Sequence, residues 1–400
     1  MGLGGLLSVF SMSYLLEYNL LGGLSPLGFL LLFDWVGSFF LGVVFFISSM
    51  VLRYSKSYMG GDSNESRFSS LVMLFVISMG FLVLSPNLVS LLLGWDGLGL
   101  ISYCLVIFYQ NSKSYNSGML TVLMNRVGDV GILLGISLLA SEGSWNFIVF
   151  DANQVNLLFK VLMGLILMAA MTKSAQVPFS SWLPAAMAAP TPVSALVHSS
   201  TLVTAGVFLL IRFYALMGEN LSAILMVISL LTLLLGGLGA CMEMDFKKVI
   251  ALSTLSQLGL MMYTLSLGLW ELTYFHMLTH AIFKALLFLC AGFVIHNMGG
   301  YQDIRMLGGL VSMTPLVSLG TLLSFLSLCG LPFTCGFYSK DLILESYLVG
   351  HSSLLVCLAF FVGVFLTFIY SLRLVYYMFL FTYNGPNLVV LGEDADMSFS

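Results

Sequence analysis

Long apolar runs separated by short polar stretches make up most of this sequence. A helix needs about 20 apolar residues to cross the ~30 Å hydrocarbon layer of a membrane, and many of these runs approach or exceed that length. We therefore predict about twelve membrane-spanning helices. The predicted ranges are 1–16, 28–52, 69–85, 86–109, 117–140, 157–177, 192–215, 221–241, 247–268, 271–296, 312–349 and 352–382.

Two of these runs contain helix-breaking residues. Run 157–177 is followed by Pro178, and run 312–349 is too long for one span and is interrupted at Pro332. Proline removes a backbone donor and clashes with the preceding turn, so neither helix can continue unbroken. Irregular backbone at membrane depth is tolerated only where protein or water satisfies its polar groups. Both breaks therefore predict a polar interior.

Each break has a lysine beside it, Lys173 just before Pro178 and Lys340 just after Pro332. Interrupted helices at corresponding positions in two halves are typical of transporters built from repeats. Five spans in each half would give the second repeat inverted topology. We therefore predict an all-α, polytopic transmembrane bundle with two inverted antiporter-like repeats. The predicted divisions are N-terminal helices and a loop at 1–68, the two halves at 69–215 and 221–382, and a polar tail at 383–400.

Composition supports the membrane and excludes other classes. The chain is 59% hydrophobic and 8% charged, against roughly 25% charged residues in a soluble domain. Its net charge of −4 and its lack of a basic run exclude nucleic-acid binding. The six cysteines lack metal-ligand spacing, and no nucleotide loop or haem arrangement is present, so we expect no bound cofactor or metal in this chain.

Ionisable residues within the apolar runs need a partner or a function, because a charge at the bilayer centre costs at least ~2.5 kcal/mol. Lys173 has no acidic neighbour in sequence, and Asp96, in another span, is its candidate partner. Moving a carboxylate away from a buried ammonium would release a proton. The structural alternatives are an Asp96 at a helix end and a Lys173 that reaches the headgroups.

The pair Arg126 and Asp129 is spaced i, i+3 and so shares one helix face. This spacing favours an intrahelical ion pair over direct proton transfer by both groups. Arginine stays protonated at any physiological pH, so Arg126 would act as a fixed charge that tunes its neighbours.

Histidines supply groups that titrate near neutral pH. His198 lies among serine and threonine hydroxyls that could hold water beside the imidazole, although a buried structural histidine is the alternative. His276, His280 and Lys284 recur at i, i+4 and i+8, which places all three on one face of a helix and favours a proton relay.

The second break contains Lys340 and Asp341, which are adjacent and therefore point to different sides of a helix. Asp341 need not neutralise Lys340, which is free to face the interior. A group of charges also lies between two spans, and we expect it to form a solvated loop and helix cap. Its members are Glu243, Asp245, Lys247 and Lys248.

Several polar motifs follow one another along nearly the whole chain. They are Gly94-Trp-Asp-Gly-Leu-Gly, Asn125-Arg-Val-Gly-Asp, Lys173-Ser-Ala-Gln, Trp182-Leu-Pro, the run from Pro190 to Thr201, Phe246-Lys-Lys-Val-Ile-Ala-Leu-Ser-Thr-Leu-Ser-Gln-Leu-Gly, the run from His276 to Lys284, and Gly336-Phe-Tyr-Ser-Lys-Asp. In type and order they closely resemble the NADH dehydrogenase (ubiquinone) subunit 5 family, the antiporter-like subunits of mitochondrial complex I.

This resemblance implies a proton-translocating subunit in the membrane arm of complex I, in the mitochondrial inner membrane. It implies that NADH, FMN, iron–sulfur clusters and ubiquinone are bound by other subunits. It also implies contacts with the lipid bilayer and with other membrane-arm subunits, including the antiporter-like subunit 4. By motif match, the implied proton-translocation residues are Asp96, Asp129, Lys173, His198, His276, His280, Lys284, Lys340 and Asp341.

The sequence departs from the family in three respects. Asp96 stands where the family most often has the longer glutamate, and we expect that residues 1–400 do not include the family's first helix or its final helices with their lateral helix. Two other functions remain open. The same motifs occur in the large subunit of multisubunit cation/proton antiporters, and a scaffold role in assembly is the third hypothesis.

Overall fold

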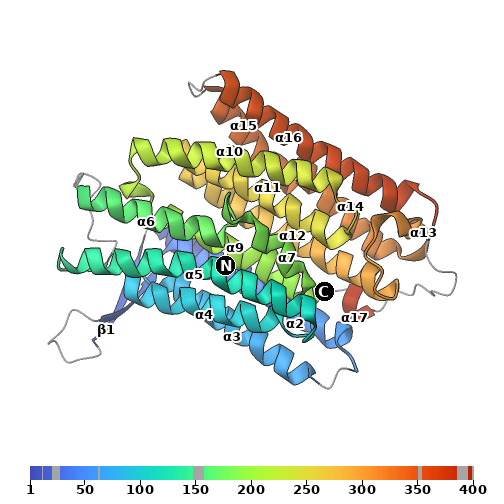
Figure 1. Cartoon of the computed structure of the whole chain (residues 1–400), viewed down its shortest axis with the longest axis horizontal. Helices are drawn as coiled ribbons and strands as arrows, with labels where there is room; N and C mark the ends of the chain where they lie inside the picture. The colour runs from blue at the N-terminus through green and yellow to red at the C-terminus, as the bar shows by residue number, and fades with distance from the viewer. Residues whose placement is uncertain are drawn as a thin grey trace.

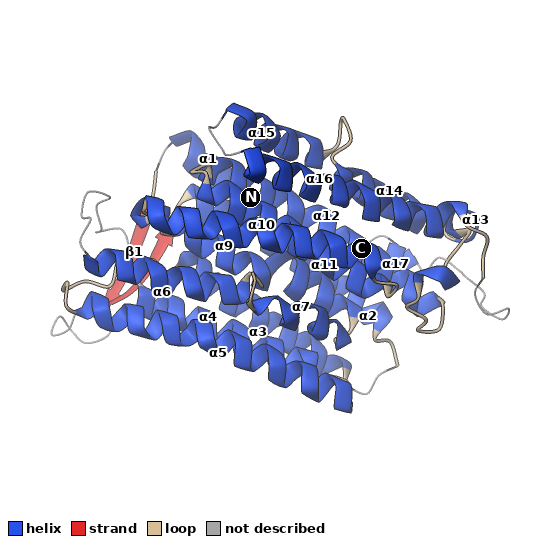
Figure 2. Ribbon diagram, turned by 45° about the horizontal axis from the view of Figure 1, so that its top comes forward, coloured by secondary structure: helices blue, strands red, loops and turns tan. Residues whose placement is uncertain are grey.

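The computed structural model describes residues 1–10, 12–19, 28–61, 64–146, 157–349, 354–384 and 395–398. Within these residues the chain is a bundle of long helices that lie roughly along one direction (Figure 1). A small two-stranded hairpin lies at one end of the bundle (Figure 2). The predicted all-α, polytopic membrane fold is confirmed.

The N-terminal region differs from the prediction. Helix α1 (Gly2–Phe10) is followed by β1 (Tyr14–Asn19), which pairs antiparallel with β2 (Gly28–Phe33). The expected helices at 1–16 and 28–52 are therefore wrong where the strands lie. Helix α2 begins only after Asp34, whose carboxylate accepts a hydrogen bond from the backbone N–H of Gly37 at 3.0 Å. The apolar run continues across this cap, so hydrophobicity alone did not show the strand-to-helix change.

The first half of the bundle follows α2. Its long helices begin at capped positions: the Asn87 side chain accepts from the Val89 N–H, and Asn111 and Ser114 form a capping box. After α2 (Trp35–Tyr58), its elements are α3 (Glu65–Leu84), α4 (Leu88–Val106), α5 (Ser112–Ala140), α6 (Leu157–Lys173), η2 (Phe179–Ser181), α7 (Trp182–Ala185), η3 (Ala186–Ala188), α8 (Thr191–Val193), η4 (Ser194–Thr201), α9 (Leu202–Arg212) and η5 (Tyr214–Leu216).

The second half lies against the first. Helix α9 of the first half and helices α11 and α12 of the second half lie in the middle of the bundle (Figures 1 and 2). Its elements are α10 (Glu219–Met242), α11 (Phe246–Ser266), α12 (Trp270–Asn297), η6 (Ile304–Met306), α13 (Leu310–Met313), α14 (Pro315–Cys329), α15 (Cys335–Val349), α16 (Leu354–Val375), η7 (Tyr376–Leu380) and α17 (Ala395–Ser398).

Nine helical segments in the described part of the chain are long and apolar enough to cross a membrane. Three shorter helices, α6, α14 and α15, have 17, 15 and 15 residues and lie beside the two breaks. Both breaks are present, since α6 ends at Lys173 and the run 312–349 separates after Cys329.

Glycines let the central helices approach closely. A Cβ on Gly259 of α11 would lie 2.7 Å from the backbone nitrogen of Leu233 in α10, and one on Gly236 would lie 2.8 Å from that of Ser256. Because lipid tails are as apolar as the helix surfaces, no hydrophobic effect drives the helices together, and such close van der Waals contact is a main source of helix packing in membranes. The α10–α11 pair therefore provides a rigid wall behind the polar interior.

Candidate functional site

The middle of the bundle contains a series of buried titratable side chains. Most of the predicted site residues lie there, and the structure brings them from five helical segments into one interior. Those that are at most 6% exposed are Asp129, Lys173, His198, His276, His280, Lys284 and Lys340. No group of three His, Cys, Asp or Glu side chains in the described ranges is arranged to hold a metal ion.

Lys173 is the last residue of α6, and its side chain reaches α4. Its Nζ donates a hydrogen bond to the backbone oxygen of Trp95 at 3.2 Å and lies 5.0 Å from the centroid of the Trp95 ring. The partner is thus a carbonyl and an aromatic face. Asp96, the predicted partner, is the next residue on α4 but forms no direct ion pair with Lys173 among the described residues.

Asp96 and Asp129 instead lie around Arg126. The Arg126 Nη1 is 3.2 Å from Asp129 Oδ2 and 3.7 Å from Asp96 Oδ2, so the predicted i, i+3 ion pair is confirmed. The second carboxylate oxygens of both aspartates are buried and make no hydrogen bond to the described residues, and neither does Oδ1 of Asn125. Buried acceptors are normally bonded to protein or ordered water, so this cluster is suited to hold water.

The break after Lys173 is stabilised by side chains from other elements. The Trp182 indole N–H donates to the Thr172 carbonyl at 2.9 Å, and the Thr232 hydroxyl of α10 donates to the Gln176 side chain at 2.6 Å. Ala175 adopts a left-handed φ of 53° there. The helix therefore ends four residues earlier than predicted, before Pro178 is reached.

His198 lies in η4, where the backbone forms a π-helix. It is buried, neither ring nitrogen has a partner among the described residues, and its ring centroid is 6.1 Å from that of Trp182. The nearby hydroxyls do not bond to the imidazole. Ser200 and Thr201 donate to the carbonyl of Leu196 at 3.0 and 2.7 Å, so they complete the irregular helix instead.

The predicted row on α12 is formed as expected, with its three members buried and the rings of His276 and His280 6.1 Å apart. The His276 ring nitrogens lie 2.9 Å from the Ser339 hydroxyl and 3.3 Å from Gln257 Oε1.

Lys284 ends this row and donates to the Ser253 hydroxyl at 2.6 Å. Ser253, Gln257 and Ser339 were not among the predicted site residues, although all three lie within the quoted motifs. The polar positions within the apolar run of α11 were the signal for the first two.

Lys340 lies on α15, after the second break. Its Nζ donates to the backbone oxygen of Leu328, near the end of α14, where helix carbonyls lack intrahelical partners. Gly336 permits this packing, since a Cβ there would lie 1.8 Å from the Ser327 oxygen. Asp341 is only partly buried and forms no hydrogen bond or ion pair with Lys340 among the described residues, in agreement with their predicted divergence.

One charge expected in the solvated loop is buried. Asp245 and Lys248 form an exposed ion pair at 2.7 Å, as a loop and cap predict. Lys247, however, is only 6% exposed and lines a cavity. The two lysines differ because consecutive helix residues point about 100° apart, so one of them must turn inward at the start of α11.

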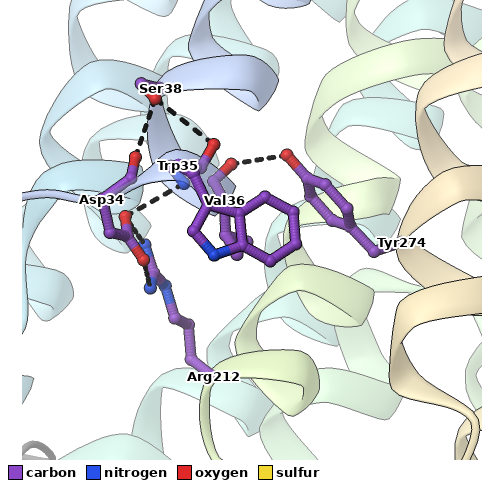
Figure 3. Close-up of polar contacts among 7 residues, drawn as sticks. Asp34, Trp35, Val36, Ser38, Arg212 and Tyr274 are labelled. Carbon is purple, nitrogen blue, oxygen red and sulfur yellow. Dashed lines mark hydrogen bonds and ion pairs between the residues drawn. The ribbon is translucent and has the colours of Figure 1, made fainter. Parts of the chain in front are cut away.

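An ion pair that was not predicted from the sequence lies at the hairpin end of the bundle (Figure 3). Both terminal nitrogens of Arg212, at the end of α9, donate to the Asp34 carboxylate, with Nη2 at 2.8 Å from Oδ1. Nearby, the Tyr274 hydroxyl of α12 donates to the Val36 carbonyl at 2.6 Å, and its ring packs edge-on against Trp35. These contacts join α2, α9 and α12. An aspartate directly before an apolar run was the available signal.

Comparison with known proteins fits this arrangement. The family described as "NADH:quinone oxidoreductase/Mrp antiporter, TM" matches residues 85–367. This chain belongs to that family. Within the NADH:quinone oxidoreductase/Mrp antiporter family, the more specific "NADH-Ubiquinone oxidoreductase (complex I), chain 5 N-terminus" matches residues 22–69. The resemblance drawn from the motifs is confirmed.

Curated relatives in this family are named NADH-ubiquinone oxidoreductase chain 5. The protein from Aedes aegypti is 56% identical over 372 residues, covering 92% of this chain and 64% of that protein. The protein from Lumbricus terrestris is 51% identical, covering 90% of this chain and 62% of that protein. The chain thus spans less than two thirds of the length of these relatives.

Solved structures agree on the fold. A chain of the Mrp complex from Dietzia sp. DQ12-45-1b superposes with a TM-score of 0.88 at 30% identity, covering 99% of this chain and 45% of that chain. A chain of an archaeal membrane-bound sulfane sulfur reductase gives a TM-score of 0.83 at 22% identity, covering 97% of this chain and 81% of that chain. The second likeness concerns the fold alone.

Proposed function

We propose that this chain is a proton-translocating, antiporter-like subunit of a respiratory NADH:ubiquinone oxidoreductase. Other subunits would oxidise NADH and reduce ubiquinone, and this chain would move protons across the membrane without redox chemistry of its own. The observation that supports this most directly is the buried series of titratable groups inside an apolar bundle. The names of the relatives support the assignment to complex I.

In the first half, the proposed switch consists of Lys173 and the two aspartates around Arg126. A buried ammonium is stable only while carboxylates or dipoles compensate its lost hydration. If Arg126 draws the aspartates toward itself, Lys173 keeps only the Trp95 carbonyl and aromatic face as partners. A proton would then pass from Lys173 toward the centre of the bundle.

In the second half, the proposed relay runs through α12 to the break. Lys284 contacts Ser253, the imidazoles of His280 and His276 follow along the same helix face, and His276 contacts Ser339. Ser339 precedes Lys340 on α15. Neutral imidazoles can both donate and accept protons, which suits them to connect two lysines. His198 is the proposed connection between the two halves.

The proposed setting is the mitochondrial inner membrane, next to other membrane-arm subunits that include subunit 4. Basic residues gather at the end of the bundle opposite the hairpin, and the positive-inside tendency favours that end on the matrix side. They are Arg53, Lys56, Arg67, Lys113, Lys247, Lys248, Arg305 and Arg373, whereas the hairpin end has Lys160 and Arg212 among the described residues.

The proposal is tested with Lys173→Met in a reconstituted complex containing this chain. We expect NADH-driven proton uptake into vesicles to fall by about tenfold or more, the loss typical of removing a proton-transfer group. The amount of assembled complex is measured in parallel. Normal pumping by a fully assembled variant would refute the role of Lys173.

The alternative is the large subunit of a cation/proton antiporter, favoured by the likeness to the Mrp chain over 99% of this sequence. Proton transport measured in vesicles that contain the protein distinguishes the antiporter from the complex I subunit. Sodium-driven proton exchange in the absence of NADH would support the antiporter, and NADH-dependent proton uptake without a sodium requirement would support the complex I subunit.

A further inference from the structure

A large cavity lined by polar and apolar side chains opens at the end of the bundle opposite the hairpin. It has a volume of about 850 Å³ and lies between the starts of α5 and α11, the short segments α7 and η3, and the end of α12. Exposed residues such as Lys113 and Asn116 form its rim, and the buried residues Ser114, Ser117 and Lys247 line its inner part. A cavity with this lining and volume is suited to hold many water molecules.

A stripe of buried polar residues leads inward from this cavity along α5. Its members are spaced by three or four residues, so they lie on one face of the helix, and each is at most 7% exposed. They are Ser114, Ser117, Thr121, Asn125 and Asp129.

The two ends of this stripe lie in different cavities. Ser114 and Ser117 line the large cavity, whereas Asn125 and Asp129 line a small pocket that also contains Asp96 and Arg126. Thr121 lies between them. The distance along α5 from Ser117 to Asp129 is roughly 18 Å, from 1.5 Å per residue.

The stripe has free hydrogen-bonding capacity. The hydroxyls of Ser117 and Thr121 donate to their own helix, to the carbonyls of Ser114 and Gly118 at 3.0 and 2.7 Å, which leaves their oxygens able to accept. Asn125 Oδ1 and Asp129 Oδ1 are buried without a partner among the described residues. Serine and threonine in membrane helices often make such bonds to their own backbone for structural reasons alone. Here, however, the same face continues to unpartnered acceptors and a carboxylate.

We propose that the large cavity is the aqueous mouth of a proton path, and that water held along Ser117, Thr121 and Asn125 conducts protons to Asp129. The proposal rests on the proposed function, since it assigns the access route to the first-half switch. A hydronium ion in the cavity gives up its proton and becomes water, the proton moves along the hydrogen-bonded water, and the Asp129 carboxylate becomes neutral. Lys247 and Asp245 give the mouth charges of both signs.

The first experiment removes one hydroxyl while keeping side-chain size. In the assembled complex, Thr121→Val is expected to slow NADH-driven proton uptake by roughly tenfold, the factor set by ~1.4 kcal/mol of added barrier. Thr121→Ser keeps the hydroxyl and should restore uptake.

Thr321→Val is the matched control, because Thr321 is equally buried and donates to its own helix at 2.8 Å but lies in α14, away from the stripe. Equal uptake rates for Thr121→Val and the parent, at equal assembly, would overturn the route. So would equal losses for Thr121→Val and Thr321→Val.

The second experiment tests the mouth without depending on pumping. Ser117→Cys should react with a membrane-impermeant methanethiosulfonate added to the side with the basic loops, and peptide mass spectrometry assigns the modified position. Ser48→Cys is the control, since Ser48 is equally buried on α2 but lines no described cavity.

Absence of labelling at Ser117→Cys from either side would overturn the proposal. If the complex shows no NADH-driven proton uptake, the proposed function fails, but labelling of Ser117→Cys still decides whether the cavity is aqueous.

Discussion

The two helix breaks hold a buried lysine ammonium in different surroundings. Lys173 precedes its break and Lys340 follows its own, and in each case the ammonium donates to a backbone carbonyl of a neighbouring helix. Only Lys173 has carboxylates in a cluster nearby, at Asp96 and Asp129. A backbone carbonyl is therefore sufficient to hold a buried lysine ammonium. A carboxylate that can move toward or away from the lysine is needed to change the lysine's protonation state.

The backbone of the second break gives the largest expected effect. Gly336→Ala places a methyl group against the Ser327 carbonyl and should cost about 3 kcal/mol of stability through overpacking. At the first break, Ala175→Gly should be stabilising by about 1 kcal/mol, since it relieves a left-handed alanine. Thermal denaturation of the purified complex measures both. Gly164→Ala, at an open position on α6, is the neutral control.

Removing a carboxylate from the first half should reduce proton uptake far more than removing one from the second half. Asp129→Asn is expected to reduce proton uptake by about 100-fold, because it removes the proton acceptor beside Arg126. Asp341→Asn should leave uptake within about twofold, since a partly exposed carboxylate without contact to Lys340 contributes little. Similar losses in the two variants would contradict the difference between the halves.

The Asp34–Arg212 pair couples first-half α9 to α2, against which second-half α12 packs. Asp34→Asn leaves a partly buried guanidinium without its counter-charge and removes part of the α2 cap, at an expected cost of about 2 kcal/mol. Tyr274→Phe removes one neutral hydrogen bond and should cost about 1 kcal/mol. Melting temperatures of the two variants test the order, and a larger effect for Tyr274→Phe would show that the ion pair is not the main connection.

The smallest expected effect lies outside the membrane, in the loop before the second break. Hydrogen bonds from Arg305 hold the pKa of Asp303 below its ordinary value. A lowered carboxyl pKa stabilises the fold above the ordinary value near 4, and this stabilisation is lost as the pH falls through the lowered pKa.

Because the pair is exposed, solvent screening keeps its contribution to stability small. The difference in melting temperature between the parent and Asp303→Asn should shrink between pH 6 and about pH 3. A melting-temperature difference that grows as the pH falls over this range would contradict the predicted loss of stabilisation.

The sequence predicted the features that depend on residue type and spacing. Proline and glycine located both breaks, and the i, i+4, i+8 spacing placed His276, His280 and Lys284 together. It could not predict which atom each side chain reaches, because this depends on how neighbouring helices are rotated. For that reason the Trp95 carbonyl, Ser253 and the inward turn of Lys247 were missed. The hairpin was missed because its strands are as apolar as a helix.

The π-helix at Ser194–Thr201 determines the rotation of everything that follows it in α9. A π turn takes up one residue more than an α turn, so it shifts the later side chains by about 100° around the helix axis. Arg212, which bonds to Asp34, lies at the end of α9, after this shift. The irregular segment around His198 therefore also sets the phase of the helix, and a change there would be transmitted to the hairpin end of the bundle as a rotation.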